Sequence, residues 1–238
     1  HPNFFSWAKV KSLFWRGAGF DAARHVTLLS VSYRNSRAVT AVANDILKLK
    51  HARFGSVDRE STGLMRTADC PEGEVSCFSI SSPAVAELDE KTRRSTKVAV
   101  VVLRDEHKAA ARARFRTPLV FSVIETKGLE YETVILFRLV ASERLTFAEL
   151  CEGVCQEDLR VGELEYRRAK DKGDRSLETY KFFVNALYVA LTRAVEKVYL
   201  VEDDPGHPLL QLLGVRHEGS ASGVQAQTAS IEEWQREA

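Results

Sequence analysis

The sequence predicts an α/β fold in which a mostly parallel sheet is flanked by helices. Short, nearly continuous apolar runs occur at residues 26–31 and 97–103, as in strands that are buried on both faces of a parallel sheet. Such runs alternate with segments whose apolar residues recur at helical spacing, which is typical of βαβ units. With 238 residues and 45% hydrophobic content, the chain can bury one sizeable core or two small ones.

The chain opens with an aromatic segment that we separate from the main domain. Residues 3–16 carry five aromatic side chains on a predicted helix. These side chains could form stacking platforms for single-stranded bases, or the helix could dock on a neighbouring domain, which we favour because no basic groove surrounds it. We therefore treat residues 1–25 as a lead-in and residues 26–204 as the main domain.

The same criteria predict the remaining elements. After residues 26–31, Asn35 or Ser36 is a suitable N-cap for a helix. Further strands are expected at residues 75–80, 97–103, 119–123, 133–139 and 197–201, and helices at 83–93, 105–116 and 208–213. Residues 142–172 are dense in Glu, Arg and Leu and predict a charged, solvated helical insertion.

Residues 100–107 imitate a Walker B strand that ends in Asp105 and Glu106, a pair able to hold Mg²⁺. However, the sequence has no G-x-x-x-x-G-K-[ST] loop, so no phosphate-binding loop accompanies that strand. Asp105 is instead expected to cap the following helix, with Glu106 in its first turn.

The composition excludes several classes of protein. The net charge of +1 argues against binding nucleic acid through bulk charge. No apolar run is long enough to span a membrane, and no signal peptide is present, so we expect a cytoplasmic protein. The four cysteines lack the CxxC pairs of a zinc ribbon and are expected to be reduced and free of metal: Cys70, Cys77, Cys151 and Cys155.

An apolar segment at residues 181–201 carries one arginine that does not suit a core. Helical spacing extends through Ala194, with Thr192 and Arg193 near the helix end. A buried helix tolerates Arg193 only where its guanidinium reaches water, a carboxylate or a phosphate. It could simply extend to solvent. However, residues 187–194 (Leu-Tyr-Val-Ala-Leu-Thr-Arg-Ala) resemble motif VI of the UvrD/Rep-type superfamily 1 helicases, whose arginine is a finger on the γ-phosphate of ATP.

Residues 32–36 (Ser-Tyr-Arg-Asn-Ser) lie between a predicted strand and a predicted helix, where α/β sheets bind ligands. Tyr33 could stack on a base and Arg34 could pair with phosphate oxygens. With Ala43 and Asn44 downstream, the segment resembles motif IV of the same family, "NYRS…AN", with Ser32 at the usual Asn. The resemblance implies that Tyr33 stacks on adenine and that Arg34 contacts the γ-phosphate.

Residues 125–134 (Glu-Thr-Lys-Gly-Leu-Glu-Tyr-Glu-Thr-Val) resemble motif V, "xAKGLEfxxV". Gly128 permits a left-handed backbone, while Lys127 and Glu130 offer a cation and a carboxylate. The resemblance implies that Glu130 binds the ribose of ATP and that the residues before Lys127 contact the nucleic-acid backbone. Ile124 stands where the family usually has a histidine, in the segment that contacts nucleic acid. This departure weakens the expectation of a nucleic-acid contact relative to that of a nucleotide contact.

Together the motifs identify residues 1–204 as similar to the second RecA-like domain of a UvrD/Rep-type DNA helicase, without its own Walker A loop. The resemblance implies ATP and Mg²⁺ as cofactors, with Mg²⁺ held mainly by the N-terminal RecA-like domain of a parent chain, and single-stranded nucleic acid, DNA in particular, as a partner. We expect the parent to couple ATP hydrolysis to translocation or unwinding, and this chain alone to be inactive. The implied ATP-binding residues are Tyr33, Arg34, Lys127, Gly128, Glu130, Thr192 and Arg193, with Arg34 and Arg193 catalytic. The implied nucleic-acid-binding residues are Ser122, Ile124, Glu125 and Thr126.

Two alternatives were weighed against this prediction. A degenerate helicase-like domain could act as a protein-interaction module without catalysis, which Ile124 and the near-zero net charge favour and the retained Arg34 and Arg193 oppose. A Rossmann dinucleotide-binding domain is excluded by the lack of G-x-G-x-x-G after a strand. Residues 205–238 are expected to form a docking helix, a flexible linker at 219–230 and the start of a further segment. The chain is expected to be a fragment, because of how it begins and ends.

Overall fold

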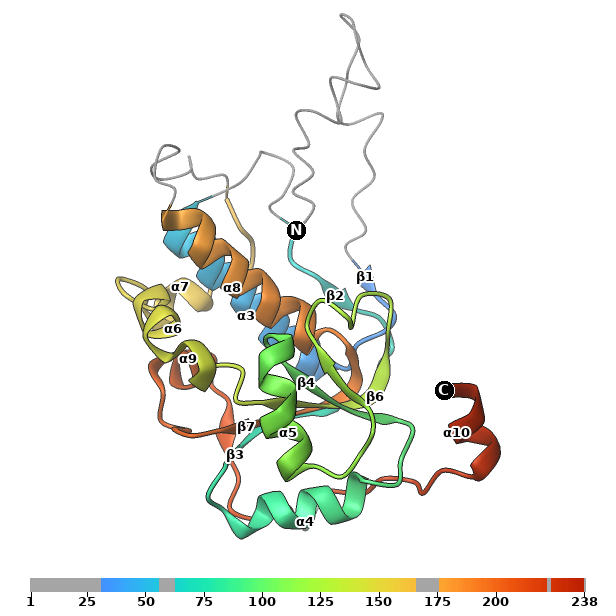
Figure 1. The fold of residues 1–238 in the computed structure, drawn as a ribbon. Helices are drawn as coiled ribbons and strands as arrows, with labels where there is room; N and C mark the ends of the chain where they lie inside the picture. The colour runs from blue at the N-terminus through green and yellow to red at the C-terminus, as the bar shows by residue number, and fades with distance from the viewer. Residues whose placement is uncertain (1–30, 56–62, 166–175, 222–223, 238) are drawn as a thin grey trace, which may run out of the picture.

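The computed structural model describes residues 31–55, 63–165, 176–221 and 224–237. The helix expected at residues 3–16 and nearly all of the strand expected at residues 26–31 lie outside these ranges. The described residues form a six-stranded, fully parallel sheet in the order β5-β4-β6-β7-β3-β8 (Figure 1). Its strands are β3 (Glu74–Ser79), β4 (Val98–Val102), β5 (Val120–Ser122), β6 (Tyr131–Phe137), β7 (Ala194–Glu202) and β8 (Arg216–His217). The predicted fold class, a parallel α/β sheet flanked by helices, is confirmed.

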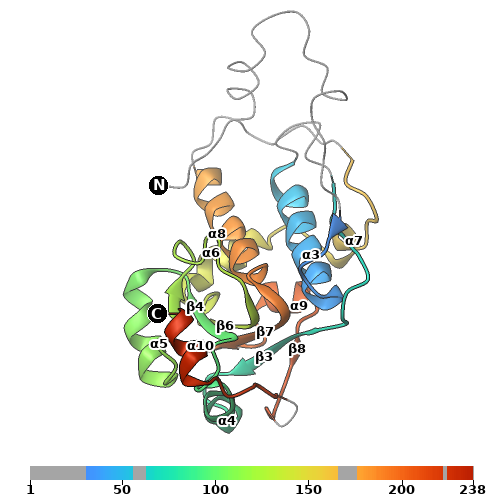
Figure 2. The same ribbon diagram turned by 90° about the vertical axis from the view of Figure 1, so that its right-hand side faces the viewer.

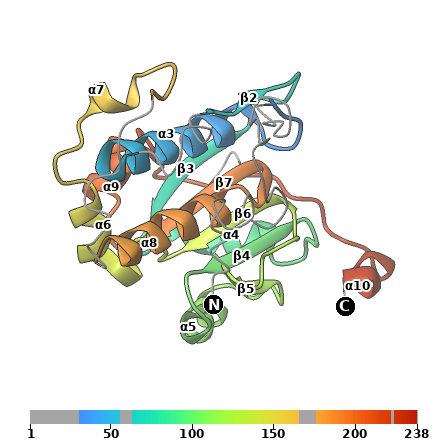
Figure 3. The same ribbon diagram turned by 90° about the horizontal axis from the view of Figure 1, so that it is seen from above.

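The sheet separates two apolar cores because successive residues of a strand point to opposite faces. In β4, Ala99 and Val101 belong to one core and Val98, Val100 and Val102 to the other, and all five are buried. Helices α3 (Arg37–Phe54) and α8 (Ser176–Leu191) lie side by side over the first face (Figure 3). Helix α4 (Pro83–Thr92) covers the opposite face (Figure 2), where Ala111 of α5 (Lys108–Arg114) also packs.

The remaining described elements are short. They are β1 (Val31–Ser32), β2 (Arg66–Thr67), the 3₁₀ turns η1 (Asp105–His107) and η2 (Ala141–Glu143), and the helices α6 (Arg144–Leu150), α7 (Gln156–Leu159), α9 (Pro208–Leu212) and α10 (Ile231–Glu237). β1 pairs with β2 in a separate two-stranded sheet, so the described end of the strand expected at 26–31 is not part of the main sheet.

The boundary between α8 and β7 differs from the prediction. The helical spacing predicted a helix through Ala194, but α8 ends at Leu191 and Ala194 is the first residue of β7, paired with Tyr131 of β6. Strand pairing with a distant segment therefore overrides the local helical pattern. Asp105 was expected to cap a helix, which is also wrong: it begins the turn η1, and its carboxylate pairs with Lys108 at 3.0 Å.

Two segments expected to be solvated instead contribute to the cores. In the charged insertion, α6 buries Phe147 and Leu150 against the first core. In the segment predicted as a flexible linker, Ala221 and Val224 are buried in the second core, and the backbone N–H of Ala229 donates to the carbonyl oxygen of Arg94 at 2.8 Å. A few apolar side chains therefore anchor both segments to the cores, although most of their neighbours in the sequence are polar.

All four cysteines are free thiols, and burial raises the pKa of Cys77 to about 12 and that of Cys151 to about 11. None of the helices that the structure describes combines the length and hydropathy needed to cross a lipid bilayer.

Candidate functional site

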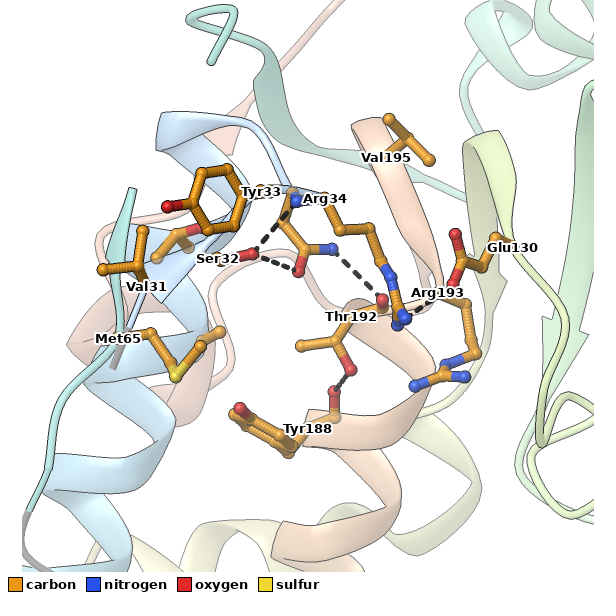
Figure 4. Close-up of a pocket in the computed structure, with 13 residues that line it drawn as sticks. Val31, Ser32, Tyr33, Arg34, Met65, Glu130, Tyr188, Thr192, Arg193 and Val195 are labelled. Carbon is orange, nitrogen blue, oxygen red and sulfur yellow. Dashed lines mark hydrogen bonds and ion pairs between the residues drawn. The ribbon is translucent and has the colours of Figure 1, made fainter. Parts of the chain in front are cut away.

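A cavity of about 720 Å³ opens beside the amino-terminal ends of β6 and β7, between the loop that precedes α3 and the end of α8 (Figure 4). Segments far apart in the sequence meet there. The lining residues are Val31, Ser32, Tyr33, Arg34, Asn35, Thr40, Ala43, Met65, Glu130, Tyr188, Thr192, Arg193 and Val195. Residues 32–36 do follow a strand, as predicted, but relative to the main sheet this cavity lies at the amino end and not at the usual carboxyl end.

Three consecutive backbone carbonyls hold these segments together. The side-chain nitrogen of Asn35 donates to the carbonyl oxygens of Thr192 and Ala194, at 3.1 and 2.7 Å. The backbone N–H of Tyr131 donates to the carbonyl oxygen of Arg193 at 3.0 Å. Asn35 directly follows Arg34, and Tyr131 directly follows Glu130. The backbone around Arg193 therefore fixes the positions from which the Arg34 and Glu130 side chains extend into the cavity.

The loop before α3 is clamped at a second point, Ser36. Its side-chain oxygen accepts from the backbone N–H of Val39 at 3.4 Å, so Ser36 is the N-cap of α3, and its hydroxyl donates to the carbonyl oxygen of Glu196 at 2.8 Å. Gly73 makes this approach possible, because a Cβ at Gly73 would lie 2.0 Å from Ser36 Oγ and 2.3 Å from the Glu196 carbonyl oxygen. The loop is thus held on β7 by a contact that only glycine permits.

Two arginines and one carboxylate carry the charge of the cavity. Arg34 Nη2 pairs with Glu130 Oε1 at 2.6 Å. Arg193 donates through Nε to the carbonyl oxygen of Val189 at 3.1 Å and through Nη1 to that of Leu129 at 3.4 Å. Burial lowers the pKa of Arg193 and the nearby Arg34 lowers it further, while Glu130 acts in the opposite direction. Because guanidinium groups carry positive charge, a polyvalent anion would relieve the repulsion between these two.

The other end of the cavity is apolar and aromatic. Tyr33 is 82% exposed and lies on the side of Val31 and Met65, away from the Glu130 and Arg193 side chains (Figure 4). An aromatic ring open to solvent on one face can stack on a planar base. The cavity therefore suits a ligand that carries a planar ring at one end and several anionic oxygens at the other.

The remaining predicted nucleotide residues contribute less directly. Lys127 and Gly128 are exposed and are not among the described residues that line the cavity; Gly128 has the left-handed backbone that was predicted, with φ of 89°. Thr192 lines the cavity, but its hydroxyl lies 2.8 Å from the carbonyl oxygen of Tyr188 and closes the last turn of α8.

The predicted nucleic-acid residues lie at the carboxyl end of β5, away from this cavity, and only two are accessible. Ile124 is 74% exposed and Glu125 is also exposed. Ser122 and Thr126 are buried, with the backbone N–H of Ser122 donating to Glu125 Oε2 at 2.9 Å and the Thr126 hydroxyl donating to the carbonyl oxygen of Val123 at 2.7 Å. Their side chains are therefore not presented to a ligand, and a nucleic-acid contact at this turn stays a prediction.

Sequence reasoning missed the residues that assemble the cavity. Asn35 was predicted only as a possible N-cap, a role that belongs to Ser36, and Gly73 was not predicted to have a role. Met65 and Tyr188 were not singled out, although both line the cavity. The one available signal was the position of Asn35 directly after Arg34.

A divalent cation does not fit this cavity by itself. Glu130 is the one carboxylate among the described residues that line it and is already paired with Arg34, next to a second guanidinium. A polyphosphate fits better than a metal ion, because its negative charge would balance the positive charge of the two arginines. Among the residues that the structure describes, no group of three or more His, Cys, Asp or Glu side chains is placed to bind a metal.

No protein-family model matches this chain, and no curated protein matches it. Among solved structures, the chain is similar to the C-terminal domain of a possible DNA helicase from Lactobacillus plantarum WCFS1. The two sequences are 17% identical, the similarity covers 76% of this chain and 92% of that one, and the TM-score is 0.35. At this identity and TM-score the likeness does not by itself assign a function.

Proposed function

We propose that this chain is the C-terminal RecA-like half of an ATP-dependent helicase or translocase of the UvrD/Rep type, located in the cytoplasm. The observation that supports this proposal is the convergence of three separately recognised motifs on one cavity. Tyr33 and Arg34, Glu130, and Arg193 come from three distant segments, and all four line it. Unrelated chance resemblances would have no reason to meet in space.

In this proposal Arg34 and Arg193 bind the polyphosphate of ATP and Tyr33 stacks on its base. The transition state of phosphoryl transfer spreads negative charge over several oxygens, and an arginine supplied to it can accelerate the reaction by about 10³–10⁵. Glu130, assigned to the ribose, is paired with Arg34 at 2.6 Å. Nucleotide binding would therefore exchange one partner of Arg34 for another.

An N-terminal RecA-like domain would complete the site. It would contribute the phosphate-binding loop, the Mg²⁺ ligands and the residues that activate water, none of which this cavity provides. Arginines that reach the phosphates only when two domains close would couple hydrolysis to domain motion, and hence to movement along single-stranded nucleic acid, DNA in our proposal.

The test joins this chain to its N-terminal RecA-like domain and measures ATP hydrolysis with and without single-stranded DNA. We expect DNA to stimulate the wild type, and Arg193→Ala or Arg34→Ala each to lower turnover by about 10²-fold or more. Arg138→Ala is the matched control, because Arg138 is an exposed arginine paired with Asp203 at the opposite end of the sheet. The chain alone should hydrolyse no ATP.

A second candidate is a degenerate domain that serves as a protein-interaction module. The Arg34–Glu130 ion pair and the buried Ser122 and Thr126 hydroxyls favour it, because these groups already have partners within the chain. A joined protein that is inert, or as active without Arg34 and Arg193 as with them, would support this second function and reject the first.

A further inference from the structure

Asn35 links the two arginines of the cavity through one side-chain amide. It directly follows Arg34, and its nitrogen donates to the carbonyl oxygens of the residues on either side of Arg193, Thr192 at 3.1 Å and Ala194 at 2.7 Å. Its oxygen accepts from the hydroxyl of Ser32 at 3.3 Å. Both N–H groups of the amide thus donate within the chain and its oxygen accepts a hydrogen bond there, so the protein itself holds the amide in place.

Helix capping does not account for this arrangement. Ser36 is the N-cap of α3, whereas the side chain of Asn35 donates to carbonyl oxygens at the junction between α8 and β7. Asn35 is only 8% exposed. A buried amide that donates both of its N–H groups favours one arrangement of the two segments over others, because a displacement leaves these polar groups without partners.

The cavity needs such a tether because its two arginines repel each other. Arg34 has Glu130 as a counter-ion at 2.6 Å, whereas among the described residues Arg193 donates to backbone carbonyl groups, those of Val189 and Leu129. A neutral donor can hold the two segments together without adding charge, whereas an aspartate at the same position would face two carbonyl oxygens with no proton to offer.

We propose that Asn35 is a positioning residue, which sets the spacing of Arg34 and Arg193 so that both reach the oxygens of one polyphosphate. The inference rests on the proposed function for the identity of the anion. The position of the two arginines, however, can be measured without any nucleotide.

The test compares Asn35→Asp and Asn35→Ala with Ser82→Ala in the full 238-residue chain. Ser82 is the N-cap of α4 on the opposite face of the sheet, so its loss is a control for helix destabilisation. With ¹⁵N-labelled arginine, we expect both Asn35 variants to shift the side-chain N–H signals of Arg34 and Arg193, and Ser82→Ala to leave them in place. Unchanged signals in the Asn35 variants, or equal shifts in Ser82→Ala, would overturn the inference.

Titration with inorganic tripolyphosphate provides the second readout. Both Asn35 variants should bind it about tenfold more weakly than the wild type, the effect of about 1.4 kcal/mol expected when one or two hydrogen bonds are lost. Adding Asn35→Ala to the Arg34→Ala/Arg193→Ala double variant should then cause no further loss, because Asn35 acts through those arginines. An additional tenfold loss in that background would show a direct or purely structural role. If the wild type binds no tripolyphosphate, the two arginines do not form an anion site and the inference is overturned, whereas ATP hydrolysis by the joined protein still decides the proposed function.

Discussion

The two ends of the same parallel sheet differ in how their charges are arranged. At the amino end, the cavity brings Arg34 and Arg193 together against a single carboxylate, Glu130. At the carboxyl end, cations and carboxylates are paired with each other, namely Arg104 with Glu143, Arg138 with Asp203, and Lys108 with Asp105 and Glu125. The first arrangement has two guanidiniums for one carboxylate and so attracts an anion, whereas in the second each of these cations already has a carboxylate partner. A net charge of +1 for the whole chain conceals this difference.

The largest expected effect concerns the backbone contact that builds the amino end. Gly73→Ala would add a Cβ 2.3 Å from the carbonyl oxygen of Glu196, at a φ of +68°. Left-handed strain and overpacking should together lower the free energy of unfolding by about 3–4 kcal/mol. Gly128→Ala is the matched control: its φ is +89° but nothing lies within 4 Å of the added Cβ, so the loss should be only about 1 kcal/mol. Urea denaturation measures both, and equal losses would show that the Gly73 contact does not hold the loop.

A buried carboxylate at the carboxyl end should produce the next largest effect. Glu202, the last residue of β7, is 1% exposed and accepts the backbone N–H groups of Val140 and Ala141 at 2.9 and 2.8 Å. Burial raises its pKa to about 7 from an ordinary value of 4.5, although these two hydrogen bonds oppose the change. The folded chain therefore keeps a proton that the unfolded chain loses between pH 4.5 and 7, and stability should fall as the pH rises through that window.

The expected size of this loss is about 2–3 kcal/mol, because one pKa unit corresponds to about 1.4 kcal/mol. Glu202→Gln cannot titrate, so the stability of the wild type relative to this variant should be about 2–3 kcal/mol greater at pH 4.5 than at pH 8. Asp203→Asn removes an exposed neighbouring charge that is a smaller cause of the raised pKa than burial, so this variant should keep most of the pH dependence of the wild type. A pH-independent difference between the wild type and Glu202→Gln would mean that Glu202 is ionised throughout.

Local patterns predicted the strands because the central strands are buried on both faces. The apolar run at 97–103 contains β4, and the run at 133–139 contains most of β6. A continuous apolar run of this length is typical of a strand that is buried on both faces of a parallel sheet. The end of α8 could not be predicted in the same way. Thr192 to Ala194 are compatible with a helix, and what ends it is pairing with Tyr131 and Asn35, contacts that no local pattern contains.

In the candidate site too, the sequence predicted some residues and not those whose role depends on contacts between distant segments. Motif resemblance predicted Tyr33, Arg34, Glu130 and Arg193, and the structure brings all four to one cavity. It did not point to Asn35 or Gly73, because their importance comes from the distance to a carbonyl group on another segment. Nor could it reveal that Glu125 is paired with Lys108, since the two residues meet only when β4 and β5 lie side by side.

The smallest expected effect tests the internal neutralisation of the carboxyl end. Glu125 accepts the backbone N–H of Ser122 at 2.9 Å and pairs with Lys108, whose hydrogen bond is the main cause that lowers the pKa of Glu125. Glu125→Gln keeps an oxygen for Ser122 but removes the negative charge, so that Lys108 keeps one carboxylate partner, Asp105, in place of two and can meet a phosphate more readily. We expect the affinity of the chain for single-stranded DNA at low salt to rise about threefold, with a steeper salt dependence.

Glu106→Gln is the control. Glu106 is a nearby and more exposed carboxylate whose closest cation is 3.7 Å away, so its substitution should change the affinity less. Fluorescence anisotropy with a labelled oligonucleotide measures both variants, and weaker binding by Glu125→Gln would mean that the carboxylate itself holds the turn in its binding conformation.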